Sequence, residues 1–314
     1  MTNLPTPINS QDKFTQADAQ RVQINAKKHQ DPNLWETIVK RLRIDWTYNS
    51  NGIEGSTLTR GETHFFLSEG LTVEGKPLKD FMDAQNHAEA IDMLFDVVAS
   101  QQPITESFIK EVNALILRGL EFTPAKAASG QITRKPAHPG QYKKLANHVL
   151  QPDGTLHTYV EPIHVQDQMQ VLVEWINTHL HTTHTIEVAA LAHYHMVRIH
   201  PFDDGNGRGA RILMNLILMH KGHFPAVIRL DAKRRYLETL AQADAGNPAP
   251  FIAYIADAVI STNASVIQAL GRAEPDQESQ DWVDAHLTEP DDDGFDAARF
   301  ESELQLAQRN AQNL

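Results

Sequence analysis

The stretch of sequence that decides the fold is residues 200–219, HPFDDGNGRGARILMNLILM. Its second half, from Arg208 to Met219, is apolar nearly all round, a pattern typical of a helix buried at the centre of a protein. Its first half contains Pro201 and a Gly-Asn-Gly sequence, which predict a tight loop before that helix. The sequence therefore predicts a loop that opens onto the N-terminus of a buried helix.

Amphipathic helices are predicted around this stretch, because apolar residues recur at the helical spacings of three and four. One such face is formed by Trp35, Ile38, Val39, Leu42 and Trp46. Another is formed by Val188, Leu191, Ala192, His195, Met196 and Ile199. Helical patterns also cover residues 104–120, 165–180 and 250–260. There is no alternation of strands with helices and no internal repeat, so the predicted fold class is all-α.

Residues 147–160 break the helical pattern. Two short runs that carry Val, Leu, Thr and Tyr flank a Pro-Asp-Gly turn, which predicts a β-hairpin. Residues 123–142 contain three prolines and two glycines, and we expect an irregular loop there. About the first 20 residues and the acidic residues 273–314 are expected to be loose and flexible, apart from a short final helix near 297–309.

The composition excludes several classes of protein. The 314 residues include no cysteine, which rules out a disulfide scaffold, a cysteine nucleophile and a thiolate metal site. No apolar run approaches the roughly 20 residues of a membrane-spanning helix, and the start of the chain does not resemble a secretory signal. We therefore expect a cytoplasmic protein without membrane contact. The net charge of -12 argues against nucleic acid as a partner.

The Gly205-Asn206-Gly207 turn has the features of a phosphate site. A glycine turn that feeds a helix N-terminus points several backbone N–H groups into one concavity, where the helix dipole adds positive potential. Arg208 and Arg211 lie three residues apart, so both can project from the first turn toward the same anion. The turn and the two arginines therefore predict a polyphosphate-binding site.

Two further groups in the loop supply chemistry. Asp204 places a carboxylate beside the predicted phosphate site, where such a group is the usual partner of Mg²⁺, and Asp203 next to it is the alternative ligand. His200 ends the preceding helix at the rim, where a neutral imidazole can take a proton from a hydroxyl. Together these parts indicate phosphoryl or nucleotidyl transfer.

His193 and His195 are interpreted as core or surface histidines rather than as metal ligands.

Residues 200–211, HPFDDGNGRGAR, resemble the signature of the Fic family, H-P-F-x-[D/E]-G-N-G-R-x-x-R, at all nine fixed positions. The resemblance implies transfer of AMP from ATP to a Ser, Thr or Tyr hydroxyl of a target protein. It implies that His200 is the base and Asp204 the Mg²⁺ ligand. The remaining implied nucleotide-binding residues are Gly205, Asn206, Gly207, Arg208 and Arg211, together with Tyr236 against the adenine.

A second match lies upstream. Residues 50–55, SNGIEG, resemble the inhibitory motif of the family, [S/T]-x-x-x-E-[G/N], with Ser50 and Glu54 at its fixed positions. The resemblance implies that Arg211 binds the γ-phosphate of ATP. A Glu54 carboxylate paired with Arg211 would prevent that contact. The resemblance spans roughly residues 34–270 and implies the class of Fic proteins with an N-terminal inhibitory helix.

The resemblance also implies a domain plan and partners. Residues 1–100 form a helical region with the inhibitory motif, residues 104–260 form the Fic core, and residues 273–314 form the acidic tail. The hairpin at 147–160 corresponds to the flap that binds a target protein by β-augmentation, and a homo-oligomer is consistent with the family. Two alternatives to adenylyl transfer remain: removal of AMP from a modified target by the same site, and a non-catalytic nucleotide sensor.

Overall fold

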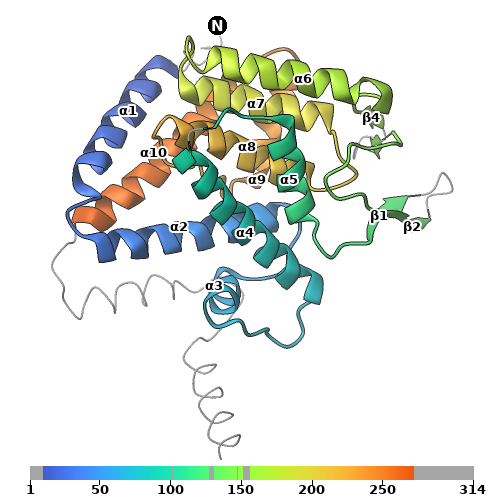
Figure 1. Cartoon of the computed structure of the whole chain (residues 1–314), viewed down its shortest axis with the longest axis horizontal. Helices are drawn as coiled ribbons and strands as arrows, with labels where there is room; N and C mark the ends of the chain where they lie inside the picture. The colour runs from blue at the N-terminus through green and yellow to red at the C-terminus, as the bar shows by residue number, and fades with distance from the viewer. Residues whose placement is uncertain (1–9, 101, 127–130, 147, 151–155, 272–314) are drawn as a thin grey trace, which may run out of the picture.

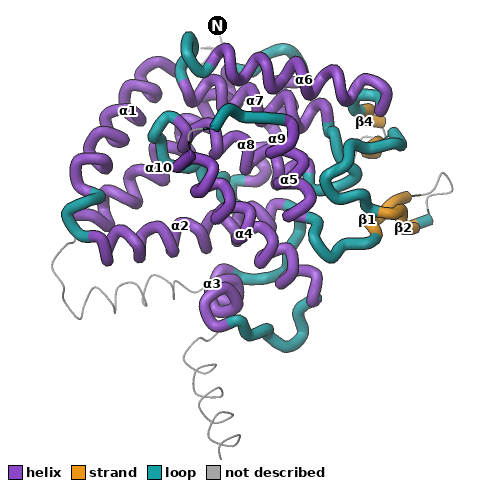
Figure 2. Tube along the Cα trace, viewed as in Figure 1, coloured by secondary structure: helices purple, strands orange, loops and turns teal. Residues whose placement is uncertain are grey.

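The computed structural model of the chain describes residues 10–100, 102–126, 131–146, 148–150 and 156–271. Within them the chain forms ten helices and two separate two-stranded hairpins (Figures 1 and 2). This confirms the all-α class with a small hairpin. The predicted tail at 273–314, with its helix near 297–309, lies outside the described residues.

The elements follow one another in a simple order. The first half of the chain forms α1 (Ser10–Lys27), α2 (Pro32–Ile53), α3 (Arg60–Glu69), α4 (Leu78–Ser100) and α5 (Glu106–Ile116). The hairpins follow as β1 (Phe122–Lys126), β2 (Ile132–Pro136), β3 (His148–Leu150) and β4 (Leu156–Thr158). The last helices are α6 (Pro162–His179), α7 (Thr185–Ile199), α8 (Asn206–His220), α9 (Lys233–Asp244) and α10 (Ala249–Gly271).

Helix α8 is the centre of the fold, as its apolar sequence predicts. Every residue from Arg208 to Leu218 is buried, and the other helices surround α8 in Figure 1. It packs most extensively on α7, whose predicted face is buried at Val188, Ala192, Met196 and Ile199 and partly buried at Leu191 and His195. Because α8 is enclosed on all sides, its N-terminal end is fixed against the rest of the core, which positions any site built there.

The N-terminal segment departs from the expectation that about the first 20 residues are loose. Residues from Ser10 onward form α1, which lies along α10 and buries Phe14, Ala17 and Ile24 (Figure 1). These three positions follow a helical spacing, but they are few among polar residues, so the sequence did not mark the segment as a packed helix. The docking of α1 explains why they are buried.

Helix α10 also corrects an expectation. By length and composition it is apolar enough to cross a membrane, whereas no such segment was expected. In this fold it packs against α1, α9 and α7. Its buried residues, which include Phe251, Ile255 and Val259, belong to the main core. Its apolar character is therefore accounted for by the interior of the fold.

Helix α2 carries the second motif toward the centre. Its start is capped by the Asp31 carboxylate, which accepts the N–H groups of Asn33 and Leu34. Its last turns are buried, although they contain the polar residues Thr47, Asn49, Ser50 and Asn51. The Asn49 carbonyl oxygen Oδ1 accepts the Leu230 N–H at 2.8 Å, which attaches this end of α2 to the loop before α9.

Both hairpins lie on one side of the molecule in Figure 1. The predicted hairpin at 147–160 is confirmed by β3 and β4, which pair antiparallel with Val149 opposite His157, while residues 147 and 151–155 lie outside the described part. The irregular loop expected at 123–142 is wrong up to residue 136, because β1 and β2 pair antiparallel there, and it is confirmed for residues 137–142. A two-stranded ribbon consists of edge strands only, where proline is tolerated, so the prolines did not prevent pairing.

Candidate active site

The corner between α7 and α8 places His200 at the rim of the site. His200 ends α7 in the left-handed region, with φ 53° and ψ 59°, and its N–H donates to the Met196 carbonyl at 2.9 Å. Among the described residues no other non-glycine residue has a positive φ. Such a conformation costs of order 1–3 kcal/mol, so the surrounding loop holds it. Gly205 begins α8 at φ 75°, where an added Cβ would crowd Asn113 and Leu117.

The Asn206 side chain forms hydrogen bonds with the backbone of this loop. Its Oδ1 accepts the Phe202 N–H at 2.9 Å, and its Nδ2 donates to the Phe202 carbonyl at 3.0 Å. Because a backbone N–H can only donate, this pair fixes which way the amide points, and Nδ2 therefore donates to His200 Nδ1 at 3.1 Å. The side chain of Asn206 is thus fully used within the loop. Any phosphate contact from Asn206 has to come from its backbone N–H at the start of α8.

The structure separates the two acidic residues of the loop. Asp203 accepts hydrogen bonds from Lys135 Nζ at 3.1 Å and from His138 Nδ1 at 2.8 Å, and only 5% of its side chain is exposed. Burial alone would raise the pKa of Asp203, but these hydrogen bonds hold it below its ordinary value. Asp204 uses one oxygen to accept the Gly205 N–H. Asp203 therefore attaches β2 and its following loop to the corner, and Asp204 is the better placed of the two for a metal ion.

Arg211 reaches from the second turn of α8 to the end of α2. Its Nε donates to Ser50 Oγ at 2.9 Å, and its Nη2 donates both to the Ser50 carbonyl and to Glu54 Oε1 at 2.8 Å. The Arg211 side chain is only 2% exposed. Burial alone would lower the pKa of Arg211, and the Glu54 carboxylate more than offsets that effect. The two residues of the predicted inhibitory motif are thus both bonded to the predicted phosphate-binding arginine.

The Glu54 carboxylate lies directly over the start of α8. A Cβ added to Gly207 would overlap Glu54 Oε1, so the glycine leaves the space that the carboxylate fills. Desolvation alone would raise the pKa of Glu54, but the charges of Arg211, Arg208 and Lys233 hold it below its ordinary value. An ionised carboxylate therefore occupies a helix N-terminus that would otherwise attract a phosphate.

Arg208 is also engaged by a carboxylate. Its Nη1 lies 2.9 Å from Asp83 Oδ1 of α4, and its side chain is almost completely buried. Asp83 also pairs with Lys79 on the same helix. In this structure, then, each of the two motif arginines contacts an acidic residue from the N-terminal helical region.

Sequence reasoning missed three residues that shape the corner. Asp83 is the first. Asn113 of α5 is the second: its Nδ2 donates to the Asp204 carbonyl at 2.9 Å, and its Oδ1 accepts the Gly140 N–H at 3.0 Å. Tyr159, directly after β4, stacks on the His200 ring. Each of them reaches the motif through a long-range contact, so its place at the corner follows from the fold.

Tyr236 is buried rather than open. Its side chain is 3% exposed, and its hydroxyl lies 2.9 Å from His193 Nε2. Burial lowers the pKa of His193 to about 3, so this histidine is neutral where it bonds the hydroxyl. His193 is thus a core residue, as interpreted. The contact of Tyr236 with adenine stays a prediction, and it requires the ring to become exposed.

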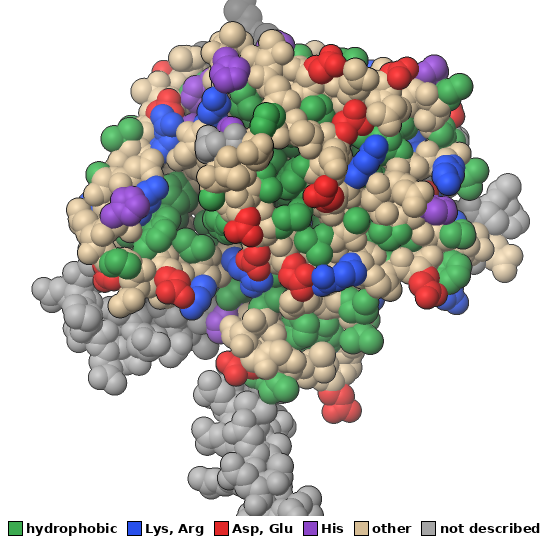
Figure 3. Space-filling view, viewed as in Figure 1, with side chains coloured by type: hydrophobic (Ala, Val, Ile, Leu, Met, Phe, Trp, Pro, Cys, Tyr) green, Lys and Arg blue, Asp and Glu red, His purple; other side chains and the backbone are tan. Residues whose placement is uncertain are grey.

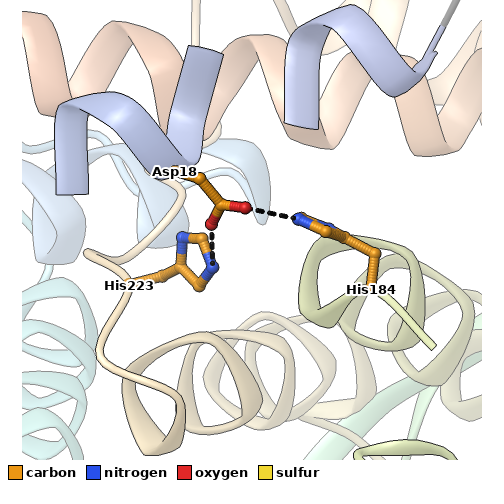
Figure 4. Close-up of side chains that lie close together, drawn as sticks. All are labelled: Asp18, His184 and His223. Carbon is orange, nitrogen blue, oxygen red and sulfur yellow. Dashed lines mark hydrogen bonds and ion pairs between the residues drawn. The ribbon is translucent and has the colours of Figure 1, made fainter. Parts of the chain in front are cut away.

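A cluster of possible metal ligands lies away from the corner, between α1, the start of α7 and the loop after α8. Asp18 lies between His184 and His223, and each imidazole Nε2 is 3.4 Å from a carboxylate oxygen (Figure 4). His184 Nδ1 accepts the Ile186 N–H, so a neutral His184 carries its proton on Nε2, the atom that would have to bind a metal. Arg21 also contacts Asp18 at 3.2 Å. We therefore interpret the cluster as a polar network that holds α1 on the core.

The visible surface carries both signs of charge. On the face in Figure 3, lysine and arginine side chains alternate with aspartate and glutamate side chains instead of gathering into one basic patch. That distribution offers no extended basic surface on this face for a nucleic-acid backbone.

Comparison with known proteins agrees with the site. The Fic/DOC family profile matches residues 103–218. The protein adenylyltransferase fic-1 of Caenorhabditis elegans is 31% identical over 67% of this chain and 38% of its own length. The protein adenylyltransferase Fic of Drosophila melanogaster is 30% identical over 74% of this chain and 44% of its own length. The chain thus spans about two fifths of the length of these curated relatives.

Solved structures extend the match over most of the described residues. A Fic domain containing signaling protein from Bacteroides thetaiotaomicron superposes with a TM-score of 0.72 at 30% identity, covering 82% of this chain and 97% of that one. A fragment of Fic-1 from C. elegans superposes with a TM-score of 0.71 at 26% identity, covering 84% of this chain and 74% of that one. From its signature, its fold and these relatives, the chain belongs to the Fic/DOC family.

Proposed function

We propose that this protein is an adenylyltransferase that moves AMP from ATP to a Ser, Thr or Tyr hydroxyl of a target protein, and that Glu54 inhibits it. The observation that carries the proposal is the convergence of His200, Asp204 and Arg211 on the N-terminus of α8, with the Glu54 carboxylate over that same N-terminus. The names of the curated relatives support the reaction type.

The chain's own groups divide the work of the reaction. The backbone N–H groups at the start of α8 and the guanidinium of Arg211 bind the phosphates, while His200 receives the proton of the target hydroxyl. The hydroxyl oxygen forms a bond to the α-phosphorus of ATP, the bond between the α- and β-phosphates breaks, and pyrophosphate leaves. Proton transfer of this kind contributes typically ~10²–10⁴ in rate.

Mg²⁺ fits the donor set at the start of α8. Asp204 supplies a carboxylate next to the proposed phosphate site, and Asp203 is already bonded to Lys135 and His138. Mg²⁺ is commonly bound by one or two carboxylates together with substrate phosphates and water. Bound there by Asp204, the ion would neutralise charge on the phosphates.

The β3–β4 hairpin is the proposed docking site for the target protein. A hairpin outside the helical core has strand edges that can pair with an extended segment of another chain. Tyr159, which follows β4, contacts His200, so a segment paired with β4 would lie close to the proposed base. The proposed Fic core is residues 104–260, and the proposed inhibitory region is residues 1–100.

A second candidate reaction is removal of AMP from a modified target by hydrolysis. Glu54 is ionised and 42% exposed at the proposed phosphate site, so it could accept a proton from an attacking water. Incubation of the wild-type protein with an adenylylated target tests this alternative, since hydrolysis releases free AMP and simple reversal of transfer requires pyrophosphate.

The decisive experiment compares self-labelling from radiolabelled ATP in three proteins. We expect weak labelling of the wild type, strong labelling of Glu54→Gly, and none of the double variant Glu54→Gly, His200→Ala. Equal labelling of all three contradicts the proposal.

If calorimetry shows that Glu54→Gly binds ATP but no turnover is detected, the protein is a nucleotide sensor instead. Mass spectrometry of a lysate treated with Glu54→Gly and ATP then identifies the target and the modified residue.

A further inference from the structure

The ring of Tyr159 lies flat on the imidazole of His200. The two ring centroids are 3.9 Å apart and the ring planes differ by 20°. Tyr159 directly follows β4, and both side chains are partly buried. Among the described residues, this stack joins the hairpin to the proposed catalytic histidine.

Lys143 supports the stack from the neighbouring segment. Its backbone N–H donates to the Pro201 carbonyl at 2.8 Å, and its ammonium donates to the Ile199 carbonyl at 3.5 Å. The same ammonium lies 5.7 Å from the centroid of the Tyr159 ring, within the range of a cation–π contact. Burial lowers the pKa of Lys143 to about 8. Lys143 therefore bridges the end of α7 and Tyr159.

A hydrogen bond from Asn206 acts on the edge of the His200 ring. Asn206 Nδ2 donates to His200 Nδ1, and the Phe202 backbone fixes the amide in that orientation. A neutral His200 therefore holds its proton on Nε2 and its lone pair on Nδ1. To accept a proton from an alcohol, Nδ1 must exchange its hydrogen bond, or the ring must turn by half a revolution about its Cβ–Cγ bond. The exchange of hydrogen bonds keeps the plane of the ring throughout, and the half-turn leaves that plane and returns to it.

We propose that Tyr159 is a positioning residue for His200, which holds the imidazole in one plane before and after its nitrogen atoms exchange partners. The hydrogen bond to Asn206 acts in the plane of the ring, and the stacked aromatic ring adds a restraint on its tilt. Because Tyr159 belongs to the end of the hairpin, a target segment that pairs with β4 also acts on the orientation of the imidazole. The catalytic part of this inference rests on the proposed adenylyl transfer.

The contact itself is testable without any activity. Stacking on an aromatic ring shifts the imidazole C–H resonances of His200 upfield in NMR spectra of histidine-labelled protein, with His200→Ala providing the assignment. We expect this shift in the wild type and in Tyr159→Phe, which keeps the ring, and its loss in Tyr159→Leu, which keeps bulk without aromaticity. The same His200 shifts in Tyr159→Phe and Tyr159→Leu would overturn the inference.

The catalytic consequence is measured in the Glu54→Gly background. We expect Tyr159→Leu to lower kcat by between about tenfold and a hundredfold, since small misplacements of a catalytic group have effects of this order. The KM for ATP should stay unchanged, and Tyr159→Phe should restore most of kcat. An undiminished kcat in Tyr159→Leu overturns the positioning role.

Tyr142→Leu is the matched control. Tyr142 is also partly buried near the motif, but its ring packs on Phe202 and its hydroxyl donates to Glu106. Its substitution should change neither the His200 resonances nor kcat, and thermal melting confirms that each variant folds. If the Glu54→Gly parent shows no labelling while the resonances behave as expected, the proposed function and the catalytic role of Tyr159 both fail, and the stacked contact stands.

Discussion

Arg211 Nη2 donates to Glu54 Oε1 across 2.8 Å, and this contact joins the last residues of the α2 segment to the second turn of α8. Ser50 adds two more bonds to the same guanidinium. The proposed inhibitory contact therefore has an ionic partner of Arg211, Glu54, and a neutral partner, Ser50, and the side chain of each can be removed separately.

We expect Ser50→Ala to activate much less than Glu54→Gly. Loss of Ser50 Oγ removes one bond to Arg211 Nε and leaves the carboxylate in place over Gly207. It leaves a buried donor unpaired, which costs about 1–3 kcal/mol of folding stability. Initial rates of self-labelling and urea denaturation of both variants measure the two effects. Equal activation by both variants would show that the carboxylate is not the obstacle.

The pH dependence of the contact follows from the lowered pKa of Glu54. A carboxyl group whose pKa is lower in the folded protein stabilises the fold above its ordinary value of 4.5, and that contribution is lost as the pH falls through the lowered folded value. The difference in unfolding free energy between wild type and Glu54→Gln should therefore shrink on going from pH 6 to pH 3. A difference that grows with acidity would contradict the ion pair.

Substitution of Asp204 should affect Mg²⁺-dependent ATP binding, and substitution of Asp203 should affect the stability of the fold. Asp204→Asn in the Glu54→Gly background is expected to weaken the Mg²⁺ dependence of ATP binding and to lower labelling by at least about tenfold. Asp203→Asn should instead destabilise the fold, because Lys135 and His138 lose their charged partner. Calorimetric titration with ATP at several Mg²⁺ concentrations, together with thermal melting, distinguishes them. If Asp203→Asn alone removes the Mg²⁺ dependence, the assignment of the ligand is wrong.

The fold was predictable from the sequence where a long helix keeps one hydrophobic pattern along its length. Helix α8 is apolar nearly all round, and it is the buried centre. Helix α1 was missed because Phe14, Ala17 and Ile24 are its few buried positions in an otherwise polar segment. The β1–β2 hairpin was missed because its prolines indicate a loop, whereas pairing depends on a partner strand that local sequence does not reveal.

The residues of the site also fall into two groups, those that a local sequence pattern predicts and those that only the fold brings to the site. The motif around Gly205 and the SNGIEG segment could be found by pattern, and the structure brings Ser50 and Glu54 to Arg211. Asp83 and Asn113 are an ordinary acid and an ordinary amide in helices distant in sequence. Their roles come from packing, which spacing along the chain does not encode.

Asn113 offers a test of how rigid the corner must be. Asn113→Ala removes the bonds to the Asp204 carbonyl and the Gly140 N–H, and we expect a loss of about 2–4 kcal/mol in unfolding free energy. It should also raise the KM for ATP in the Glu54→Gly background. Asn177→Ala is the matched control, since Asn177 bonds the Ile104 backbone away from the motif. The control should lose stability and keep its KM, and a KM that rises equally in both would reject a specific role for Asn113.

Buried histidines should make the protein sensitive to mild acid. Burial lowers the pKa of His193 to about 3 and, with Arg21, that of His223 to about 4, although Asp18 opposes the latter shift. The unfolded chain takes up protons near the ordinary value of 6.5, so between about pH 6 and pH 4 it binds more protons than the folded protein. Each such histidine then lowers the free energy of unfolding by about 1.4 kcal/mol per pH unit of acidification.

Urea denaturation at pH 7, 5.5 and 4.5 should show this decline in the free energy of unfolding, and the decline should be less steep in His223→Gln. The exposed His29→Gln is the control, and an equal change of slope in both variants would show that the burial of His223 is not the cause.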